Sequence, residues 1–218
     1  AEPNKQFDDK KVFDHTIQRF LMAVERYDSD EASSILSNAS LYLETRSFLL
    51  YVIAPLMRRI GTLWSEGEIG VGQEHLATEV VKGTLYTLRK NLSAHAGGPK
   101  ILIATPPSCL HGFGAVIAGI LATNEGWQPV YLGPNIPFEE MQEATQHVKP
   151  KVILLAVQTI LSPDHLEEME QGIASLTPGT EIWVGGPAHL VERIKCSSSV
   201  QKITSLESLH AEFAQDKN

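Results

Sequence analysis

The sequence predicts an α/β protein in which an N-terminal four-helix bundle precedes a doubly wound sheet of five parallel strands. Before residue 96, apolar residues recur at helical spacing, and an Ala-Gly-Gly-Pro linker follows at 96–99. Beyond the linker, short apolar runs alternate with amphipathic segments, which is typical of a parallel sheet with helices on both faces. We therefore expect two domains, a helical one over 1–96 and an α/β one over 99–218.

Four helices are expected in the first domain. An apolar stripe predicts the first helix, and Asp28 ends it and opens the second. Pro55 lies inside the third helix, where it should kink the helix or mark its first turn. The expected helices cover about 13–24, a short segment ending near 39, 46–64 and 72–95.

The second domain is predicted to contain five βα units. The run 100–105 is continuously apolar, as expected for a strand that is buried on both faces. The expected strands are 100–105, 129–132, 151–157, 181–184 and 200–203, and the expected helices are 114–125, 137–148, 163–175, 187–194 and 205–215. Sheets of this kind bind ligands beyond the carboxyl ends of their strands, so the loops there are the candidate site.

The composition is that of a globular protein, because 43% of the 218 residues are hydrophobic and 20% are charged. A formal net charge of −8 argues against a surface built to bind nucleic-acid phosphates. No apolar run reaches the roughly 18 to 20 residues of a membrane-spanning helix, so we expect no membrane partner. The only cysteines, Cys109 and Cys196, make no disulfide framework, and no targeting signal is visible, so we expect a cytoplasmic location.

Candidate ligand-binding residues follow three of the predicted strands. His111 follows the first strand and is flanked by Gly112 and Gly114, which would let a large ligand approach the backbone. The third strand leads into 158–159 (Gln-Thr), and the fourth ends in 185–186 (Gly-Gly), so a slot suited to a long flat ligand is expected. No glycine-rich phosphate-binding motif is present. Taken alone, a loop histidine such as His111 is more often a helix cap or a surface residue than a ligand.

This set of residues resembles the signature of cobalamin-binding domains with a flavodoxin/Rossmann-like sheet. That signature has Asp-x-His-x-x-Gly after the first strand, a serine after the third and Gly-Gly after the fourth. His111 and Gly114 match it, whereas Cys109 replaces the acidic residue and Ala156 stands near the serine position. The resemblance implies that His111 is the lower cobalt ligand. It also implies cofactor contacts from Ser108, Cys109, Leu110, His111, Gly112, Phe113, Gly114, Gln158, Thr159, Gly185 and Gly186.

The helical domain resembles the cap of the light-sensing regulators of the CarH/LitR type, which use adenosylcobalamin. Trp64 is followed after nine residues by Glu74 and His75, with Thr78 further on. The turn between the two helices should bring these side chains together, so that the aromatic ring covers the adenosyl group and the polar pair hydrogen-bonds its edges. Individually, Trp64 could be core, Glu74 a favourable charge at a helix N-terminus and His75 a surface residue.

The resemblance implies a cobalamin-binding light sensor of a transcriptional regulator, which is not an enzyme and forms a homo-oligomer, either a dimer or a tetramer. Two departures from that group matter. Ser65 replaces the histidine that follows the tryptophan there, and a hydroxyl is a poor cobalt ligand. No basic segment or helix-turn-helix precedes residue 10, so DNA contact is expected only through a domain absent from this chain or through a protein partner.

Two alternatives remain open from the sequence. The first is a corrinoid methyl carrier of a methyltransferase system, although such carriers keep the acidic residue that Cys109 replaces and need an open upper face. The second is a haem or bilin sensor on the same scaffold, for which Cys109 offers a thiol. The sequence contains neither a Ser-His-Asp order nor a nucleophile elbow, which would have indicated hydrolytic catalysis.

Overall fold

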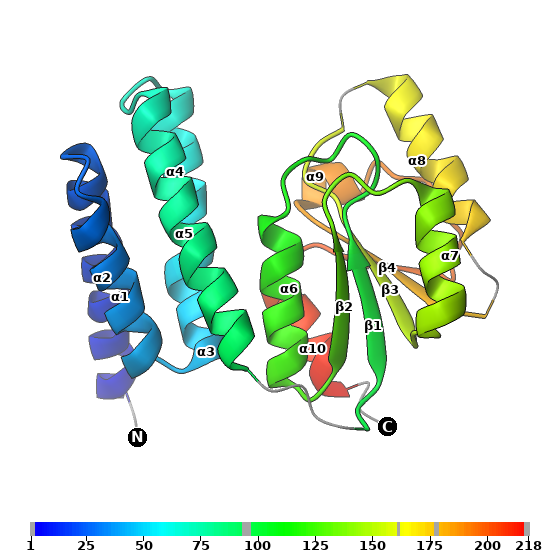
Figure 1. The fold of residues 1–218 in the computed structure, drawn as a ribbon, viewed down its shortest axis with the longest axis horizontal. Helices are drawn as coiled ribbons and strands as arrows, with labels where there is room; N and C mark the ends of the chain where they lie inside the picture. Colours follow the sequence, from blue (N-terminus) through cyan, green and yellow to red (C-terminus); the bar gives the residue numbers. More distant parts are fainter. Residues whose placement is uncertain (1–2, 93–96, 161, 177–178, 216–218) are drawn as a thin grey trace. The chain divides into compact units, whose positions relative to one another are not determined.

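The computed structural model describes residues 3–92, 97–160, 162–176 and 179–215, and the chain divides into two compact units, Ala1–Asn91 and Leu92–Asn218 (Figure 1). The first unit is helical, and the second is a sheet covered by helices, so the predicted fold class is confirmed. Among the described residues, no helix is both long and apolar enough to cross a membrane.

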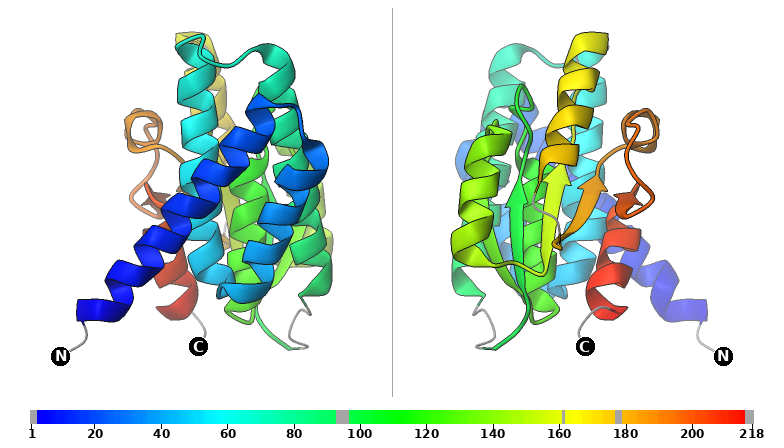
Figure 2. Two further views of the ribbon diagram at one scale, coloured as in Figure 1. Left: turned by 90° about the vertical axis from the view of Figure 1, so that its left-hand side faces the viewer. Right: turned by 90° about the vertical axis from the view of Figure 1, so that its right-hand side faces the viewer.

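Within residues 3–91, the helical unit contains four helical segments. They are α1 (Pro3–Glu25), α2 (Ser29–Tyr42), the contiguous α3 (Thr45–Ser47), η1 (Phe48–Ile53) and α4 (Ala54–Ser65), and α5 (Val71–Asn91). Helix α2 packs against both α1 and α5, and Figure 2 shows α1 running obliquely across the others. Phe20, Leu36, Phe48, Leu56 and Leu85 lie in the core of this unit, each almost completely buried. The fourth helix was expected to reach 95, but 93–96 lie outside the described residues.

Pro55 is accommodated by a local change in helix geometry. The six residues of η1 form a π-helical turn in which the N–H of Ala54 donates to the carbonyl of Leu49. Pro55 follows in the first turn of α4, where its missing N–H costs least. Because the wider π turn shifts the hydrogen-bond register before the proline ring, the helix continues through this position instead of ending.

The second unit is a five-stranded, fully parallel sheet with the strand order β2-β1-β3-β4-β5. Its strands are β1 (Lys100–Ala104), β2 (Gln128–Gly133), β3 (Val152–Ala156), β4 (Glu181–Gly185) and β5 (Val200–Ile203). Its helices are α6 (Phe113–Asn124), α7 (Phe138–Val148), α8 (Pro163–Ser175), α9 (Ala188–Val191) and α10 (Leu206–Gln215). Helix α9 is shorter than the expected 187–194, since the chain turns after Val191.

The sheet carries helices on both faces. Helices α6 and α10 cover one face, and α7 and α8 cover the other (Figures 1 and 2). Beneath α6 and α10, the rings of Trp127, Trp183 and Phe213 pack together with centroids 5.6 to 6.1 Å apart. The indole Nε1 of Trp127 donates to the carbonyl of Phe213 at 3.1 Å, which ties α10 to the sheet. This aromatic cluster stabilises the packing of α10 against the sheet unit.

Candidate functional site

The segment between β1 and α6 is tied to the loop that follows β2. The hydroxyl of Thr105, which is completely buried, donates to the carbonyl of Cys109 and accepts the N–H of Asn135 at 2.8 Å. The side-chain oxygen of Asn135 in turn accepts the N–H of Ser108 at 2.8 Å. Ser108 and Asn135 both have positive φ, 63° and 58°, so both loops turn sharply at this contact. The carboxyl ends of β1 and β2 therefore form one connected platform.

His111 extends from this platform with an exposed side chain, two residues before α6 begins. Leu110 beside it is 69% exposed, whereas Cys109 is completely buried and its thiol donates to the carbonyl of Thr159 at 3.3 Å. The structure thus separates residues that the sequence grouped together. The imidazole of His111 faces solvent, while the thiol of Cys109 joins the segment to the exit of β3.

The predicted glycines allow close approaches within the chain itself. A Cβ on Gly112 would lie 2.6 Å from the hydroxyl of Tyr131, and one on Gly114 would lie 2.9 Å from Nε2 of Gln158. Gly186 is the most constrained, because a Cβ there would lie 2.1 Å from the carbonyl oxygen of Val157. The missing side chains let the segment around His111 approach β2 and the exit of β3, and they let the exit of β4 approach that of β3. Ser108 is exposed, and the other predicted residues at this edge are half-buried: Gly112, Phe113, Gly114, Gln158, Thr159, Gly185 and Gly186.

Three residues at this edge were missed by the sequence analysis. Tyr131 lies against Gly112, Asn135 bonds Ser108, and the imidazole Nε2 of His165 lies 3.0 Å from the carbonyl of Pro107. An asparagine in the turn after β2 was a recognisable signal, since asparagine tolerates positive φ. His165 gave none, because its contact depends on how α8 packs, 58 residues along the chain.

In the helical unit, Trp64 lies in the last turn of α4 with 53% of its surface exposed, so it is not part of that unit's core. The chain then reverses through Gly67, whose φ is +74°. At the start of α5, the side chain of Gln73 accepts the N–H of Gly70 at 2.9 Å and donates to the carbonyl of Glu25 at 3.1 Å. These bonds set the turn that separates Trp64 from the first residues of α5.

The first turns of α5 present an ordered polar group. One oxygen of Glu74 accepts the hydroxyl of Thr78 at 2.8 Å, and the other lies 3.5 Å from Nε2 of His75. The side chain of His75 is 72% exposed, and that of Glu74 is 28% exposed. The hydroxyl of Ser65 donates to the carbonyl of Thr62 at 2.8 Å. Glu74 is therefore oriented by its helix neighbours, while His75 is available for contacts outside the helix.

The candidate site offers His111 as a single exposed imidazole, which suits a metal that is already coordinated by a macrocycle. Among the described residues, no three His, Cys, Asp or Glu side chains gather in a group that could hold an ion. An exposed imidazole such as that of His111 can still complete the coordination of a metal held within a macrocycle. The arrangement at the carboxyl edge thus fits a corrinoid better than a free metal ion.

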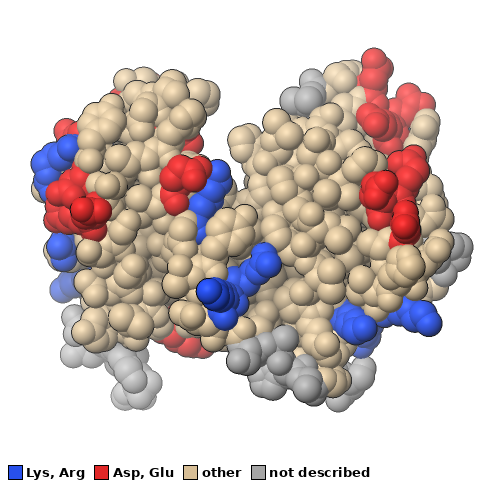
Figure 3. Space-filling view, viewed as in Figure 1, with Lys and Arg blue, Asp and Glu red and all other residues tan. Residues whose placement is uncertain are grey.

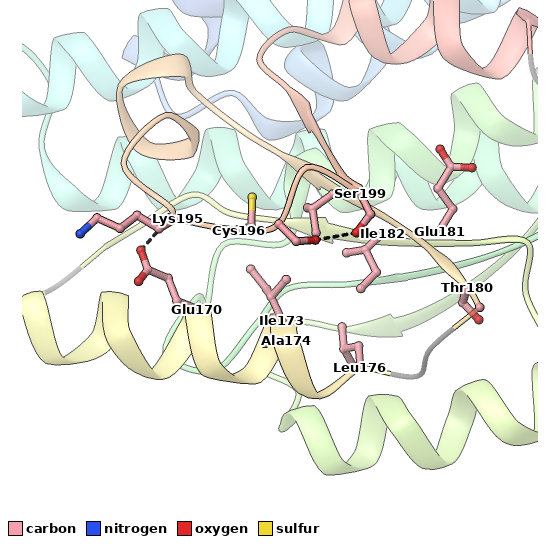
Figure 4. A pocket seen from close by; sticks show the side chains of 13 residues that line it. Glu170, Ile173, Ala174, Leu176, Thr180, Glu181, Ile182, Lys195, Cys196 and Ser199 are labelled. Atoms are coloured by element: carbon pink, nitrogen blue, oxygen red, sulfur yellow. Dashed lines mark hydrogen bonds between the residues drawn. The ribbon is translucent and has the colours of Figure 1, made fainter.

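A cavity of the sheet unit lies elsewhere. It has a volume of about 760 Å³ and is lined by α8, the start of β4 and the segment before β5, at the amino ends of these strands (Figure 4). There Glu170 accepts the N–H of Lys195 at 2.6 Å, and the hydroxyls of Ser197 and Ser199 bond each other. Figure 3 shows acidic side chains gathered over α7 and α8. Because His111 follows the carboxyl end of β1, this cavity is distinct from the candidate site.

A known family model matches part of the helical unit. Residues 16–89 match the family model described as a B12 binding domain. This stretch of the helical unit is similar to B12 binding domains. The match includes Trp64, Glu74, His75 and Thr78.

The chain is similar to two regulators of Myxococcus xanthus. It is 26% identical to the HTH-type transcriptional repressor CarA over 202 residues, covering 92% of this chain and 68% of CarA. It is also 26% identical to the HTH-type transcriptional repressor CarH over 182 residues, covering 82% of this chain and 60% of CarH. The chain therefore spans about two thirds of the length of these relatives.

Among solved structures, the Methanosarcina barkeri monomethylamine corrinoid protein matches 95% of this chain and 97% of its own, with a TM-score of 0.65 and 16% identity. This likeness shows that the two proteins share the fold.

Proposed function

We propose that this chain is the cobalamin-binding light-sensor module of a transcriptional regulator, with adenosylcobalamin as its chromophore. The observation that carries the proposal is the exposed imidazole of His111 on a segment anchored by buried hydrogen bonds. Similarity to the repressors CarA and CarH over most of the chain supports the regulatory role. Bound adenosylcobalamin would supply a light-sensitive cobalt–carbon bond.

His111 would hold the cofactor from the sheet unit by ligating cobalt through a neutral imidazole, which is a good ligand for such a metal. A ligating histidine usually donates its second ring N–H to an acceptor, often a carboxylate. Cys109 stands at the position where the related signature has that carboxylate, but its thiol donates to Thr159 and is completely buried. We therefore infer that His111 binds cobalt more weakly here than the histidine does in proteins with the acidic residue.

The helical unit would recognise the adenosyl group of the cofactor. The exposed ring of Trp64 offers an apolar face to an adenosyl group, and the carboxylate of Glu74, oriented by Thr78, offers an acceptor to its hydroxyl and amino groups. His75 adds an exposed imidazole beside this carboxylate. We propose that loss of the adenosyl group removes a packing partner of Trp64 and changes the assembly of a homo-oligomer, a dimer or a tetramer.

The output to DNA would be indirect. With a net charge of −8, this chain offers little attraction to phosphates, so we propose that DNA is contacted through a domain outside the chain or through a protein partner.

A second candidate function is that of a corrinoid methyl carrier, and Ser65 is the observation that favours it. A light sensor of the CarH type carries a second histidine at this position, whereas the hydroxyl of Ser65 is already bonded to Thr62. A methyl carrier needs no such ligand. The two functions differ in whether light or a methyl donor changes the bound cofactor.

The test is the visible absorption spectrum of the protein loaded with adenosylcobalamin in darkness and then exposed to green light. We expect a histidine-ligated spectrum in darkness and a lasting change after light. His111→Ala should abolish binding or leave the cofactor's own base attached. His189→Ala is the matched control, because His189 is also exposed after a strand of the same edge. An unchanged spectrum in His111→Ala would refute the ligand assignment, and a light-insensitive wild type would favour the methyl carrier.

A further inference from the structure

His165 is a buried histidine that the proposed function does not use. It lies in the first turn of α8 with 7% of its surface exposed. Its backbone N–H donates to the hydroxyl of Ser162, the N-cap of that helix, at 3.1 Å. Its imidazole Nε2 lies 3.0 Å from the carbonyl of Pro107, in the segment that leads to His111. The start of α8 therefore contacts the segment between β1 and α6.

The chemistry of the contact between His165 and Pro107 determines which atom donates the hydrogen bond. A carbonyl oxygen can only accept, so Nε2 of His165 carries the hydrogen and donates it to Pro107. Pro106 and Pro107 have no N–H groups, so they offer the neighbouring loops only carbonyl oxygens. The carbonyl of Pro106 accepts the N–H of Cys109, and that of Pro107 accepts from His165. Without His165, the Pro107 carbonyl would lose a buried donor.

The segment is held from two sides. Asn135 holds it on the β2 side through the N–H of Ser108. On the other side, the carbonyl of Thr159 accepts the thiol of Cys109, and His165 donates to Pro107. Leu110 and His111 extend into solvent directly after these anchored residues. A fixed base under an exposed ligand lowers the entropy that must be lost when the ligand binds.

We propose that His165 is a positioning residue, which holds the segment after β1 in the conformation that presents His111. The inference rests on the proposed function only for what His111 binds. The role of His165 in ordering the segment is a property of the protein without cobalamin.

The experiment measures amide hydrogen exchange in the full chain without cobalamin. In His165→Leu, the hydrogen-bonded N–H groups of Ser108 and Cys109 should exchange about fivefold to tenfold faster, the effect of losing one hydrogen bond. His165→Gln should restore slow exchange, because its amide can donate in place of Nε2. His210→Leu is the matched control, since it removes a half-buried histidine that bonds Glu125 at the same distance, 3.0 Å, on the other face of the sheet. Unchanged exchange at Ser108 and Cys109 in His165→Leu would overturn the proposal.

Two further measurements connect the segment to the ligand and guard against misfolding. In cobalamin-loaded His165→Leu, the fraction of histidine-ligated cofactor in the visible spectrum should fall, and His165→Gln should recover it. If His165→Leu binds with the wild-type spectrum, the positioning role is refuted. In the wild type, nitrogen NMR should show His165 in the Nε2–H tautomer with slow exchange of that proton. The opposite tautomer would also overturn the proposal, whether or not the variants fold.

Discussion

Replacing Gly186 with alanine tests how closely the exits of β3 and β4 must approach. A Cβ at this position would lie 2.1 Å from the carbonyl oxygen of Val157, which is backbone and cannot rotate away. The two exits are joined there by the N–H of Val157, which donates to Gly185 at 2.7 Å, and the N–H of Gly186 donates to Ile203 at 3.0 Å. Relief of the overlap needs a movement of about 1 Å, which would strain these bonds.

The magnitude follows from two contributions. Forcing an extra methyl group into a packed region costs about 1 to 3 kcal/mol, and each weakened backbone hydrogen bond adds about 0.5 to 1.5 kcal/mol. With two such bonds, we expect Gly186→Ala to lower the free energy of unfolding of the sheet unit by about 2 to 6 kcal/mol. Gly119→Ala is the matched control, because its Cβ would lie 3.7 Å from Ile103 Cδ1, in ordinary contact, inside α6. Its effect should be a stabilisation of up to about 1 kcal/mol.

The assay is guanidinium unfolding followed by tryptophan fluorescence in a Trp64→Phe background. Trp127 and Trp183 then report on the sheet unit alone, where they are 0% and 1% exposed. A Gly186→Ala variant within about 1 kcal/mol of the parent would refute the reasoning, because the strands would then tolerate the separation. Equal losses for Gly186→Ala and Gly119→Ala would show that the close approach is not the cause.

Three other changes have expected outcomes. Trp64→Ala should weaken adenosylcobalamin binding about tenfold to a hundredfold, or roughly 1 to 3 kcal/mol, and leave methylcobalamin binding unchanged. Titration of the protein with each cofactor measures both affinities. Equal losses of affinity for the two cofactors would exclude contact between Trp64 and the adenosyl group. After illumination, added imidazole should bind the cobalt quickly and change the wild-type spectrum, because Ser65 is a poor cobalt ligand. A stable spectrum typical of two imidazole ligands, formed without added imidazole and unchanged in His75→Ala, would contradict this prediction. Asp28→Ala should destabilise the helical unit by about 1 kcal/mol in thermal unfolding followed by circular dichroism, because Asp28 accepts the N–H of Glu31 at 2.9 Å. Unfolding at the wild-type temperature would show that this cap contributes nothing.

Local patterns were sufficient for the architecture. The apolar run at 100–105 and the alternation after it predicted the five parallel strands, because burial on both faces demands continuous apolar residues. Helical spacing and Asp28 predicted the four helical segments for the same local reason. The position of His111 after the first strand was also sufficient to place it at the carboxyl edge, since all carboxyl ends of a parallel sheet share that edge.

The tertiary structure alone decided what surrounds His111. The burial of Cys109 and its bond to Thr159 depend on how the exits of β1 and β3 come together, and neither is visible in the residues beside the cysteine. His165 lies 58 residues from Pro107 and contacts it only because α8 packs over the face of the sheet that α7 also covers. Gly186 was predicted to line a slot for a ligand, and only the structure shows that the carbonyl of Val157, just after β3, lies close to it. Sequence periodicity reports the environment averaged over a face, whereas these contacts depend on positions set to within about an ångström by packing between distant segments.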